Sequence, residues 1–297
     1  MRLGFSVPQF GDAVDEAGRI GDFAARAEEI GAASLWVGDR LLAAVDPTVG
    51  YGGTDTIPEQ FRRTLDPFAL LAVAATRTTR VTLGTSVIVG PLYPPAVLAR
   101  SLGTIGALAA GRLVAGLGIG WSPEEYAGAG LGFDHRGARL DELLDGLDAL
   151  WSAAPAPLTG PRFPLPAVHV ETPEPRPAVY LSAWSEAALR RVGRRADGWL
   201  PVGRLPSDDI EGQARALLRF RANIDAAAEE AGRDPQAVGT ALRLNAAAGT
   251  DAATIADAAR RFVDLTGFTD VFVDPMYVAP GVDDGLALLE DLIRRTA

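Results

Sequence analysis

The chain of 297 residues contains no cysteine and no lysine, so all 28 of its basic residues are arginine. The absence of cysteine excludes disulfide bonds, thiolate nucleophiles and thiolate metal ligands. The absence of lysine excludes Schiff-base chemistry and the covalent attachment of pyridoxal phosphate. If such a chain is an enzyme, we expect it to take its chemistry from a bound cofactor.

Histidine is nearly as scarce, because only His135 and His169 occur. Two histidines cannot make a three-histidine zinc site, and neither has a nucleophile-elbow serine as a partner for a Ser-His-Asp triad. The hydrolytic alternative is a metal site of carboxylates, built from Asp39, Glu124, Glu125 and Asp141. The shortage of histidine disfavours it, and we expect no metal.

The net charge of −10 argues against nucleic acid or an anionic membrane as a partner. The first ten residues, MRLGFSVPQF, lack a basic segment followed by a long apolar run, so we expect no signal peptide. No apolar stretch is long enough to span a bilayer. These observations favour a cytoplasmic protein that acts on a small molecule.

Short apolar segments alternate with segments of helical periodicity along the whole chain. The expected strands are 3–7, 34–37, 81–87, 112–118, 179–182, 198–202, 238–245 and 270–273. This alternation predicts a parallel sheet, and eight units close most naturally into a (β/α)8 TIM barrel, with an open doubly wound sheet as the alternative. We expect one domain, 1–297, with insertion loops at the face where the strands end: 41–64, 121–135 and 155–177.

The most informative stretch is 112–125, RLVAGLGIGWSPEE, where an apolar strand ends in Gly118, Ile119, Gly120 and Trp121. The glycines let another molecule approach the backbone, and the indole offers a flat apolar face. Ligands bind outside the carboxyl ends of strands in α/β proteins, so this stretch is suited to bind a planar ring. A tight turn with a packing tryptophan explains the same residues equally well. The spacing does not match the dinucleotide fingerprint.

A barrel would bring further strand ends to the same face. Asp39 could hydrogen bond a polar ring edge or carry a proton, although a loop cap or a salt bridge with Arg40 is the commoner role. Ser86 could equally be a core hydroxyl. A phosphate could bind the free N–H groups at Ala183, Trp184 and Ser185, where the next helix begins. Capping of the helix is the commoner use of such a position. The weaker candidates for substrate or anion contacts are Gln9, His135, Arg136 and Arg139.

Seven segments together resemble the bacterial luciferase-like superfamily of flavin- and deazaflavin-dependent oxidoreductases, and most of all its F420-dependent subgroup. They are LGFSVPQFG (3–11), SLWVGDRLL (34–42), DPFALLAVAATRTTRVTLGTSV (66–87), YPPAVLARSLGTI (93–105), GRLVAGLGIGWSPEEY (111–126), RGARLDE (136–142) and RRADGWLP (194–201). They cover the first two thirds of the chain in the family's order, and the last third matches mainly by pattern.

The resemblance implies a barrel whose cofactor ring lies across the carboxyl ends of the strands. Asp39 would lie beside the ring, and Ser86-Val87 would form a non-prolyl cis peptide behind it. Residues 118–121 would line the ring or its ribityl chain, and 183–185 would hold the cofactor phosphate through backbone amides. The sugar-phosphate dehydrogenase branch has histidine and glutamate where this chain has Arg40 and Trp121, so sugar-phosphate oxidation is not expected.

The resemblance therefore implies an F420-dependent oxidoreductase that transfers a hydride between the deazaflavin and a small organic substrate. Because Trp121 also occurs in FMN-using members, the alternative is a reduced-FMN monooxygenase with a separate flavin reductase. A catalytically silent binding barrel is a third hypothesis. Family members are commonly dimers, which suggests a homodimer. No catalytic residue is assigned, and the candidates for contacting the acidic tail of F420 are Arg62, Arg63, Arg136 and Arg139.

Overall fold

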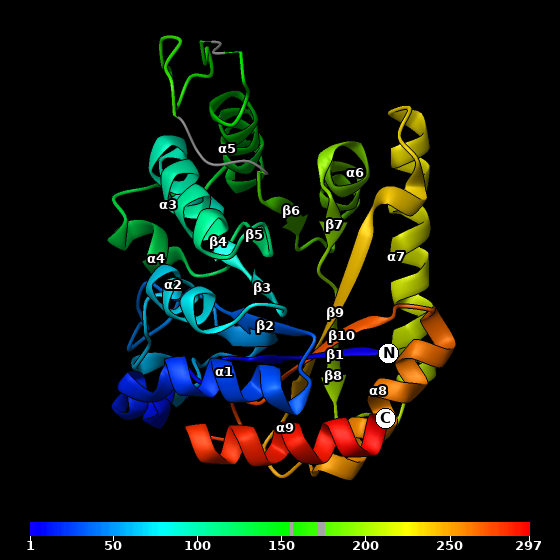
Figure 1. Ribbon diagram of the computed structural model, residues 1–297. Helices are drawn as coiled ribbons and strands as arrows, with labels where there is room; N and C mark the ends of the chain where they lie inside the picture. The colour runs from blue at the N-terminus through cyan, green and yellow to red at the C-terminus, as the bar shows by residue number, and fades with distance from the viewer. Residues whose placement is uncertain (155–156, 171–175) are drawn as a thin grey trace.

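The computed structural model describes residues 1–154, 157–170 and 176–297. Its strands form a closed parallel barrel with the helices on the outside (Figure 1). In order round the barrel, the strands are β1 (Arg2–Ser6), β2 (Ser34–Val37), β3 (Thr82–Thr85), β5 (Leu113–Gly118), β6 (Ala178–Leu181), β7 (Gly198–Trp199), β9 (Gly239–Ala246) and β10 (Asp270–Asp274). The pairing of β10 with β1 closes the ring, and the predicted (β/α)8 barrel is confirmed.

Two barrel strands are interrupted, although the sequence predicts continuous strands at 81–87 and 198–202. The third strand continues beyond β3 as β4 (Ile88–Val89), after a cis peptide bond between Ser86 and Val87 that confirms the expected feature. The sixth continues beyond β7 as β8 (Val202–Leu205), which pairs with β9. The break falls at Pro201, because proline has no N–H to donate to the sheet.

Helices follow the strands as the periodicity predicts. They are α1 (Ile20–Ile30), α2 (Pro67–Arg77), α3 (Pro95–Leu108), α5 (Arg136–Leu150), α6 (Glu186–Arg195), α7 (Ile210–Glu230), α8 (Ala252–Thr266) and α9 (Val282–Thr296), with the short α4 (Pro123–Gly128) in the 121–135 insertion. The 3-10 helices are η1 (Gly11–Arg19), η2 (Tyr51–Gly53), η3 (Glu59–Arg62), η4 (Gly90–Leu92) and η5 (Pro235–Ala237). Asp66, Ser185 and Asp251 cap α2, α6 and α8 by accepting a backbone N–H.

Large side chains fill the barrel interior. Trp36 of β2 stacks on Phe272 of β10 with ring centres 4.4 Å apart, and both are buried with Leu200 and Ala241. Gly84 of β3 makes this possible, because a Cβ atom there would lie 2.4 Å from the Trp36 ring. The barrel is therefore a packed core and not a pore.

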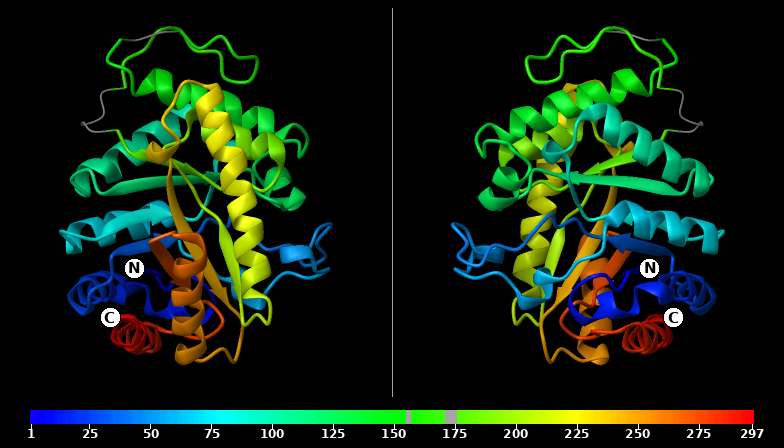
Figure 2. Two further views of the ribbon diagram at one scale, coloured as in Figure 1. Left: turned by 90° about the vertical axis from the view of Figure 1, so that its right-hand side faces the viewer. Right: turned by 90° about the vertical axis from the view of Figure 1, so that its left-hand side faces the viewer.

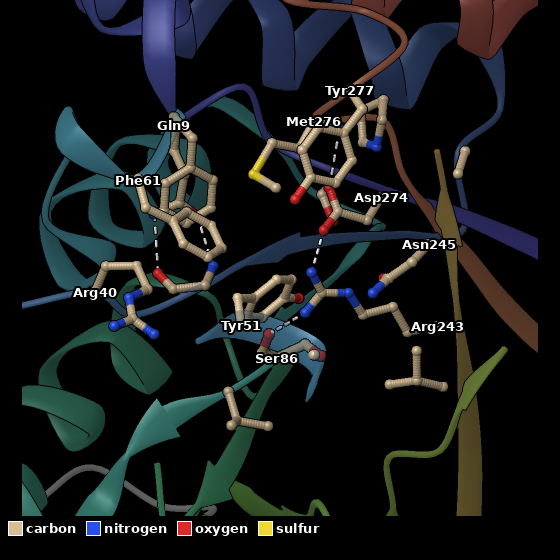
Figure 3. Close-up of a pocket in the computed structure, with 18 of the residues that line it drawn as sticks. Gln9, Arg40, Tyr51, Phe61, Ser86, Arg243, Asn245, Asp274, Met276 and Tyr277 are labelled. Carbon is tan, nitrogen blue, oxygen red and sulfur yellow. Dashed lines mark hydrogen bonds and ion pairs between the residues drawn. The ribbon is translucent and has the colours of Figure 1, made fainter. Parts of the chain in front are cut away.

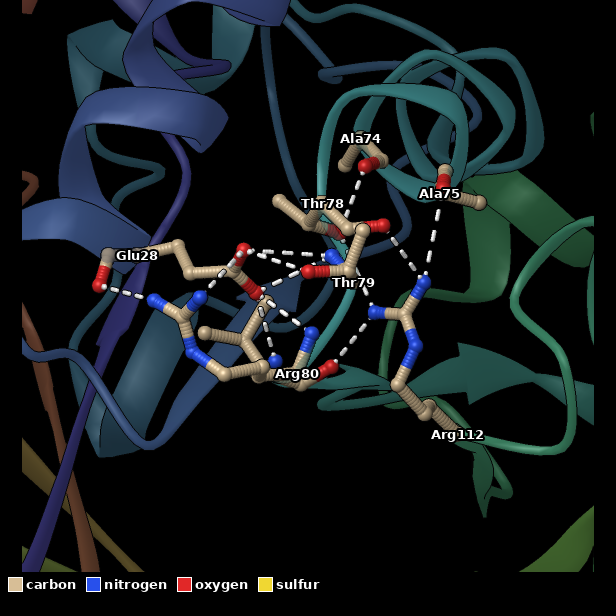
Figure 4. Close-up of polar contacts among 8 residues, drawn as sticks. Glu28, Ala74, Ala75, Thr78, Thr79, Arg80 and Arg112 are labelled. Carbon is tan, nitrogen blue, oxygen red and sulfur yellow. Dashed lines mark hydrogen bonds and ion pairs between the residues drawn. The ribbon is translucent and has the colours of Figure 1, made fainter.

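A polar network joins elements at the opposite end of the barrel from the strand carboxyl ends (Figure 4). The buried carboxylate of Glu28 in α1 accepts the backbone N–H groups of three consecutive residues, Thr79, Arg80 and Val81. Arg112, just before β5, donates to the carbonyl oxygens of Ala75, Thr78 and Val81. The network fixes the turn between α2 and β3 and has a structural role.

The insertion 41–64 leaves the barrel on one side, where it is drawn in blue (Figure 2). The expected loop at 155–177 is described only in part, because residues 155–156 and 171–175 lie outside the described residues. Within the described ranges, no helix is both long enough and apolar enough to cross a membrane.

Candidate active site

A cavity of about 820 Å³ lies where the barrel strands end. It is lined by residues from the loops that follow β1, β2, β3, β5 and β6, and by residues on and after β8, β9 and β10. Seven of the residues predicted from the sequence line it: Gln9, Asp39, Ser86, Val87, Gly120, Trp121 and Trp184. Side chains far apart in the chain thus meet in one space, as the barrel interpretation requires.

Four of the predicted residues lie just behind this lining. Gly118 packs against Val87, because a Cβ atom at Gly118 would lie 2.7 Å from Val87 Cγ2. The carbonyl oxygen of Ile119 accepts the Tyr126 hydroxyl at 2.6 Å. Ala183 is buried and Ser185 caps α6. These residues position the lining and are not part of it.

The weaker candidates at the start of α5 also lie outside the lining. His135 precedes α5 in a left-handed conformation, with φ of 58°, and is exposed. Arg136 donates to the carbonyl oxygen of Gly120 at 2.7 Å and lies 3.8 Å from the centre of the Phe133 ring. Arg139 is half-buried. Arg136 therefore reaches the cavity only through the backbone of Gly120.

Gln9 lines the cavity and also holds the loop after β2. Its side chain donates to the carbonyl oxygens of Gly38 at 2.9 Å and Leu65 at 3.3 Å, and accepts the N–H of Gly38 at 2.5 Å. Because the side chain is buried and fully engaged, it fixes the position of Asp39, which follows Gly38.

Asp39 is a buried carboxylate with two fixed donors. Its Oδ2 accepts the N–H of Val89 at 3.0 Å, and the Tyr93 hydroxyl lies 3.1 and 3.2 Å from its two oxygens. Burial raises the pKa of Asp39, and these two donors only partly oppose the effect. Burial also raises the pKa of Tyr93, so the hydroxyl stays a donor to Asp39.

An aromatic wall forms one side of the cavity, and Arg40 passes between its rings. The guanidinium carbon of Arg40 lies 4.4 Å from the Trp121 ring centre and 5.1 Å from that of Phe61. Tyr51 contacts both rings, at 5.6 Å from Trp121 and 5.0 Å from Phe61. Arg40 ends in an ion pair with the buried Glu125 at 2.9 Å. Tyr51 and Phe61 come from the insertion 41–64 and were not predicted from the sequence.

The carboxylates of the metal hypothesis have other partners. Glu124 accepts the N–H of Thr48 at 2.7 Å, and this bond lowers the pKa of Glu124 to about 2. Glu125 pairs with Arg40, and Asp141 with Arg191. Among the described residues, no three histidine or carboxylate side chains are grouped so that they could hold a metal ion.

A polar cluster forms the other end of the cavity (Figure 3). Arg243 of β9 donates to the carbonyl oxygen of Ser86 at 2.7 Å and forms an ion pair with Asp274 of β10. Asn245 lies beside Arg243, and Tyr277 lies close to Asp274. Burial, with the nearby Tyr51 and Asp274, raises the pKa of Tyr277 to about 12.

This cluster was not predicted from the sequence, although the sequence carries one signal of it. Arg243 and Asn245 alternate with Leu242 and Leu244 in a strand that is otherwise apolar. Alternate residues of a strand point to the same side, and polar residues pointing into a barrel near a strand end indicate a site. The strand was assigned by its apolar pattern alone.

A closed parallel barrel with its cavity at the strand carboxyl ends has the general organisation of TIM-barrel enzymes. A family described as luciferase-like monooxygenase matches residues 1–284, and the chain belongs to this family. The predicted family is therefore confirmed, and it is a family of enzymes.

Two curated relatives are similar over part of their length. An F420-dependent glucose-6-phosphate dehydrogenase of Kribbella flavida is 34% identical over 209 residues, or 67% of this chain. A phthiodiolone/phenolphthiodiolone dimycocerosates ketoreductase of Mycobacterium tuberculosis is 32% identical over 224 residues, or 72% of this chain. The matched region spans 57% of the length of each relative.

Solved structures share the fold across the whole chain. The monooxygenase RslO1 of Streptomyces bottropensis superimposes with a TM-score of 0.78 at 17% identity, covering 99% of this chain and 98% of its own. An F420-dependent secondary alcohol dehydrogenase, in complex with an F420-acetone adduct, gives a TM-score of 0.75 at 17% identity, covering 100% and 98%. At 17% identity, the similarity to these two structures shows a shared fold only.

Proposed function

We propose that the protein is an F420-dependent oxidoreductase that transfers a hydride between the deazaflavin and a small organic substrate. The observation that carries the proposal is the cavity, where Asp39, Ser86-Val87 and Gly120-Trp121 line one space. The 34% identity to an F420-dependent dehydrogenase supports the choice of cofactor.

The lining fits a planar heterocycle. Gly120 has a φ of 65°, and a Cβ atom there would lie 2.6 Å from Val89 Cγ1, so only glycine suits this close backbone approach. Trp121 offers a flat apolar face, while Asp39 and Ser86 offer polar atoms for a ring edge. When bound there, the deazaflavin would supply or accept the hydride, while this chain's residues hold the ring and exclude water.

The cofactor phosphate would bind at the start of α6. Ser185 uses its side chain to cap the helix by accepting the N–H of Ala188. The backbone amides of 183–185 precede a ten-residue helix, whose N-terminal end favours an anion. The exposed Trp184 lines the cavity next to this position.

The second candidate is a reduced-FMN monooxygenase supplied by a separate flavin reductase. Trp121 is compatible with it, because tryptophan at this position also occurs in FMN-using members of the family. The fold is also shared with the FMN-bound oxygenating constituent of 3,6-diketocamphane monooxygenase from Pseudomonas putida, at a TM-score of 0.71 and 15% identity, covering 100% of this chain and 98% of its own.

Titration of the purified protein with F420 and with FMN, followed by fluorescence, tests the proposal. We expect F420 to bind with a dissociation constant of about tens of micromolar or below. Trp121→Leu should weaken binding about tenfold because a stacking face is lost, and the exposed control Leu265→Ala should not. Tighter binding of FMN, with oxygen consumption when a flavin reductase is supplied, would favour the second candidate. Failure of both cofactors to bind would refute both.

Three further expectations belong to the same proposal. Residues 1–297 act as one functional domain, the protein forms a homodimer, and it works in the cytoplasm on a small molecule without nucleic acid or membrane. Light scattering of the purified protein at several concentrations tests the dimer.

A further inference from the structure

Two buried polar atoms of the cavity's polar cluster have no hydrogen-bond partner. They are Arg243 Nε and Asn245 Oδ1. Their residues lie two apart in β9, so both side chains point to the same side of the strand, and both line the cavity. Because an unpaired buried donor or acceptor is costly, the pair indicates a place for a ligand's polar atom.

Tyr51 completes this group from the opposite side of the cavity. Its ring is held against Phe61 and Trp121, and its hydroxyl points toward the guanidinium of Arg243 (Figure 3). Burial alone would lower the pKa of Arg243, but Asp274 and Tyr51 more than offset burial, and the net shift is upward. Arg243 therefore stays a charged donor within this cluster.

We propose that Tyr51, Arg243 and Asn245 form the subsite for the oxygen atom of an uncharged ketone or secondary alcohol. This inference rests on the proposed function and specifies its substrate class. The subsite adjoins Ser86, whose carbonyl oxygen Arg243 binds at 2.7 Å, and so lies next to the proposed ring position.

The donors and acceptors match both redox forms of such a substrate. An alcohol oxygen accepts the Arg243 Nε–H and donates its own proton to Asn245 Oδ1. A ketone oxygen only accepts, and the Asn245 amide, rotated by half a turn, presents its N–H to that oxygen instead. The Tyr51 hydroxyl can donate or accept. One set of side chains therefore binds the substrate on either side of a hydride transfer.

The charges of the lining favour an uncharged substrate. Two of its arginines already face carboxylates, Arg243 with Asp274 and Arg40 with Glu125, and the third, Arg204, is exposed. A phosphate placed beside Arg243 would also lie close to Asp274. Burying an anion beside an arginine whose charge is already matched is costly, so a phosphate group is disfavoured at the position next to Arg243.

The remainder of the lining favours an apolar carbon skeleton. Phe10 packs edge-on against Phe61 at 5.2 Å, and these rings with Trp121 form the apolar end of the cavity. A ketone that places its oxygen beside Asn245 can therefore bury its carbon chain against aromatic rings, which removes apolar surface from water.

The test uses cyclohexanone labelled with ¹³C at the carbonyl, together with cyclohexanol and cyclohexyl phosphate. Binding of each is measured by calorimetry, with and without saturating F420, and the carbonyl stretch of the bound ketone is recorded by infrared difference spectroscopy. The variants are Tyr51→Phe, which keeps the aromatic contacts, and Asn245→Leu. The matched control is Tyr180→Phe, which also removes the hydroxyl of a half-buried tyrosine, but of one outside the cavity lining.

We expect the carbonyl stretch of the bound ketone to move to lower wavenumber than in water-free solvent. Tyr51→Phe and Asn245→Leu should each reverse part of this shift and weaken binding about fivefold, the value of one neutral hydrogen bond. Tyr180→Phe should behave as wild type, and cyclohexyl phosphate should bind at least about tenfold more weakly than the ketone.

An unshifted carbonyl stretch, wild-type affinity in both variants, or tighter binding of the phosphate would overturn the subsite. The F420 titration is scored separately. A shifted carbonyl band in protein that fails to bind F420 would refute the proposed function, while F420 binding with an unshifted band would refute the substrate class alone.

Discussion

The guanidinium of Arg40 lies over the Trp121 indole, with its carbon atom 4.4 Å from the ring centre. These are the two positions at which the sugar-phosphate branch of the family carries a histidine and a glutamate. In this chain the two side chains contact each other and build a wall of the cavity, and neither is a proton donor with a pKa near neutrality. The substrate oxygen must therefore find its partners elsewhere, which agrees with the subsite proposed at Arg243.

The ion pair between Arg40 and Glu125 gives the first prediction. Arg40→Met should lower the free energy of unfolding by about 3–5 kcal/mol, because it leaves the Glu125 carboxylate buried without its cation. The double variant Arg40→Met, Glu125→Gln should regain most of this loss, since glutamine can still accept the Leu41 N–H. Urea denaturation measures both. A loss below about 1 kcal/mol in the single variant would contradict the structure.

Asp39 should show opposite effects on stability and binding. Because burial raises its pKa above the ordinary value of 3.8, the folded state loses stability as pH rises from that value through the raised pKa. Asp39→Asn removes this loss, so the variant should unfold less readily than wild type at pH 7 and lose its advantage toward pH 4. It should bind F420 about tenfold more weakly, because a charged hydrogen-bond partner is lost.

Denaturation across this pH range, with an F420 titration at pH 7, measures both effects. Tyr93→Phe is the matched variant: it removes a donor to Asp39 and should raise the pKa of Asp39 further, which extends the loss of stability to higher pH. A wild-type protein that is more stable than Asp39→Asn at pH 7 would count against the raised pKa.

Gly118 should affect the cofactor site through Val87. In Gly118→Ala, the new Cβ atom would lie 2.7 Å from Val87 Cγ2, so the Val87 side chain must move at the wall of the cavity. We expect F420 affinity to fall about tenfold, with a stability loss of about 1–3 kcal/mol from overpacking. Gly18→Ala is the control, because no atom lies within 4 Å of its Cβ position. Equal F420 affinities in the two variants would argue against a ring beside Val87.

Glu28, which lies at the opposite end of the barrel from the cavity, should make the free energy of unfolding depend on pH. Burial raises its pKa, but the N–H groups of Val81, Arg80 and Thr79 outweigh burial and lower the pKa below the ordinary value of 4.5. The stabilisation is therefore present above pH 4.5 and is lost as pH falls through the lowered pKa. Glu28→Gln should cost about 2 kcal/mol at pH 7 and less at pH 3. A cost that does not change with pH would exclude this role.

Periodicity was enough to predict the barrel, because the strands are short apolar segments that are largely buried and the helices between them have one apolar face. The interrupted strands were not predictable from periodicity. The residues Ser86 and Val87 continue the apolar pattern of β3, and only the resemblance to the family indicated the cis peptide there. Pro201 was a local signal for the second break, and it went unused.

The candidate site was predicted where glycine, tryptophan or an acidic residue follows a strand, as at Asp39 and Trp121. Arg243 and Asn245 lie within a strand, where the apolar pattern around them hid their position at the barrel mouth. Tyr51 comes from a loop whose path depends on contacts with Phe61 and Trp121. Such contacts between distant segments have no signature in the spacing of a single sequence.

A crystal structure of the protein soaked with F420 tests the central claim most directly. The account predicts the deazaflavin ring in the cavity, with one face against Ser86-Val87, its edge near Asp39 and Trp121 alongside. A ring bound outside this cavity, or crystals that exclude F420 at saturating concentration while the cavity stays open, would contradict it.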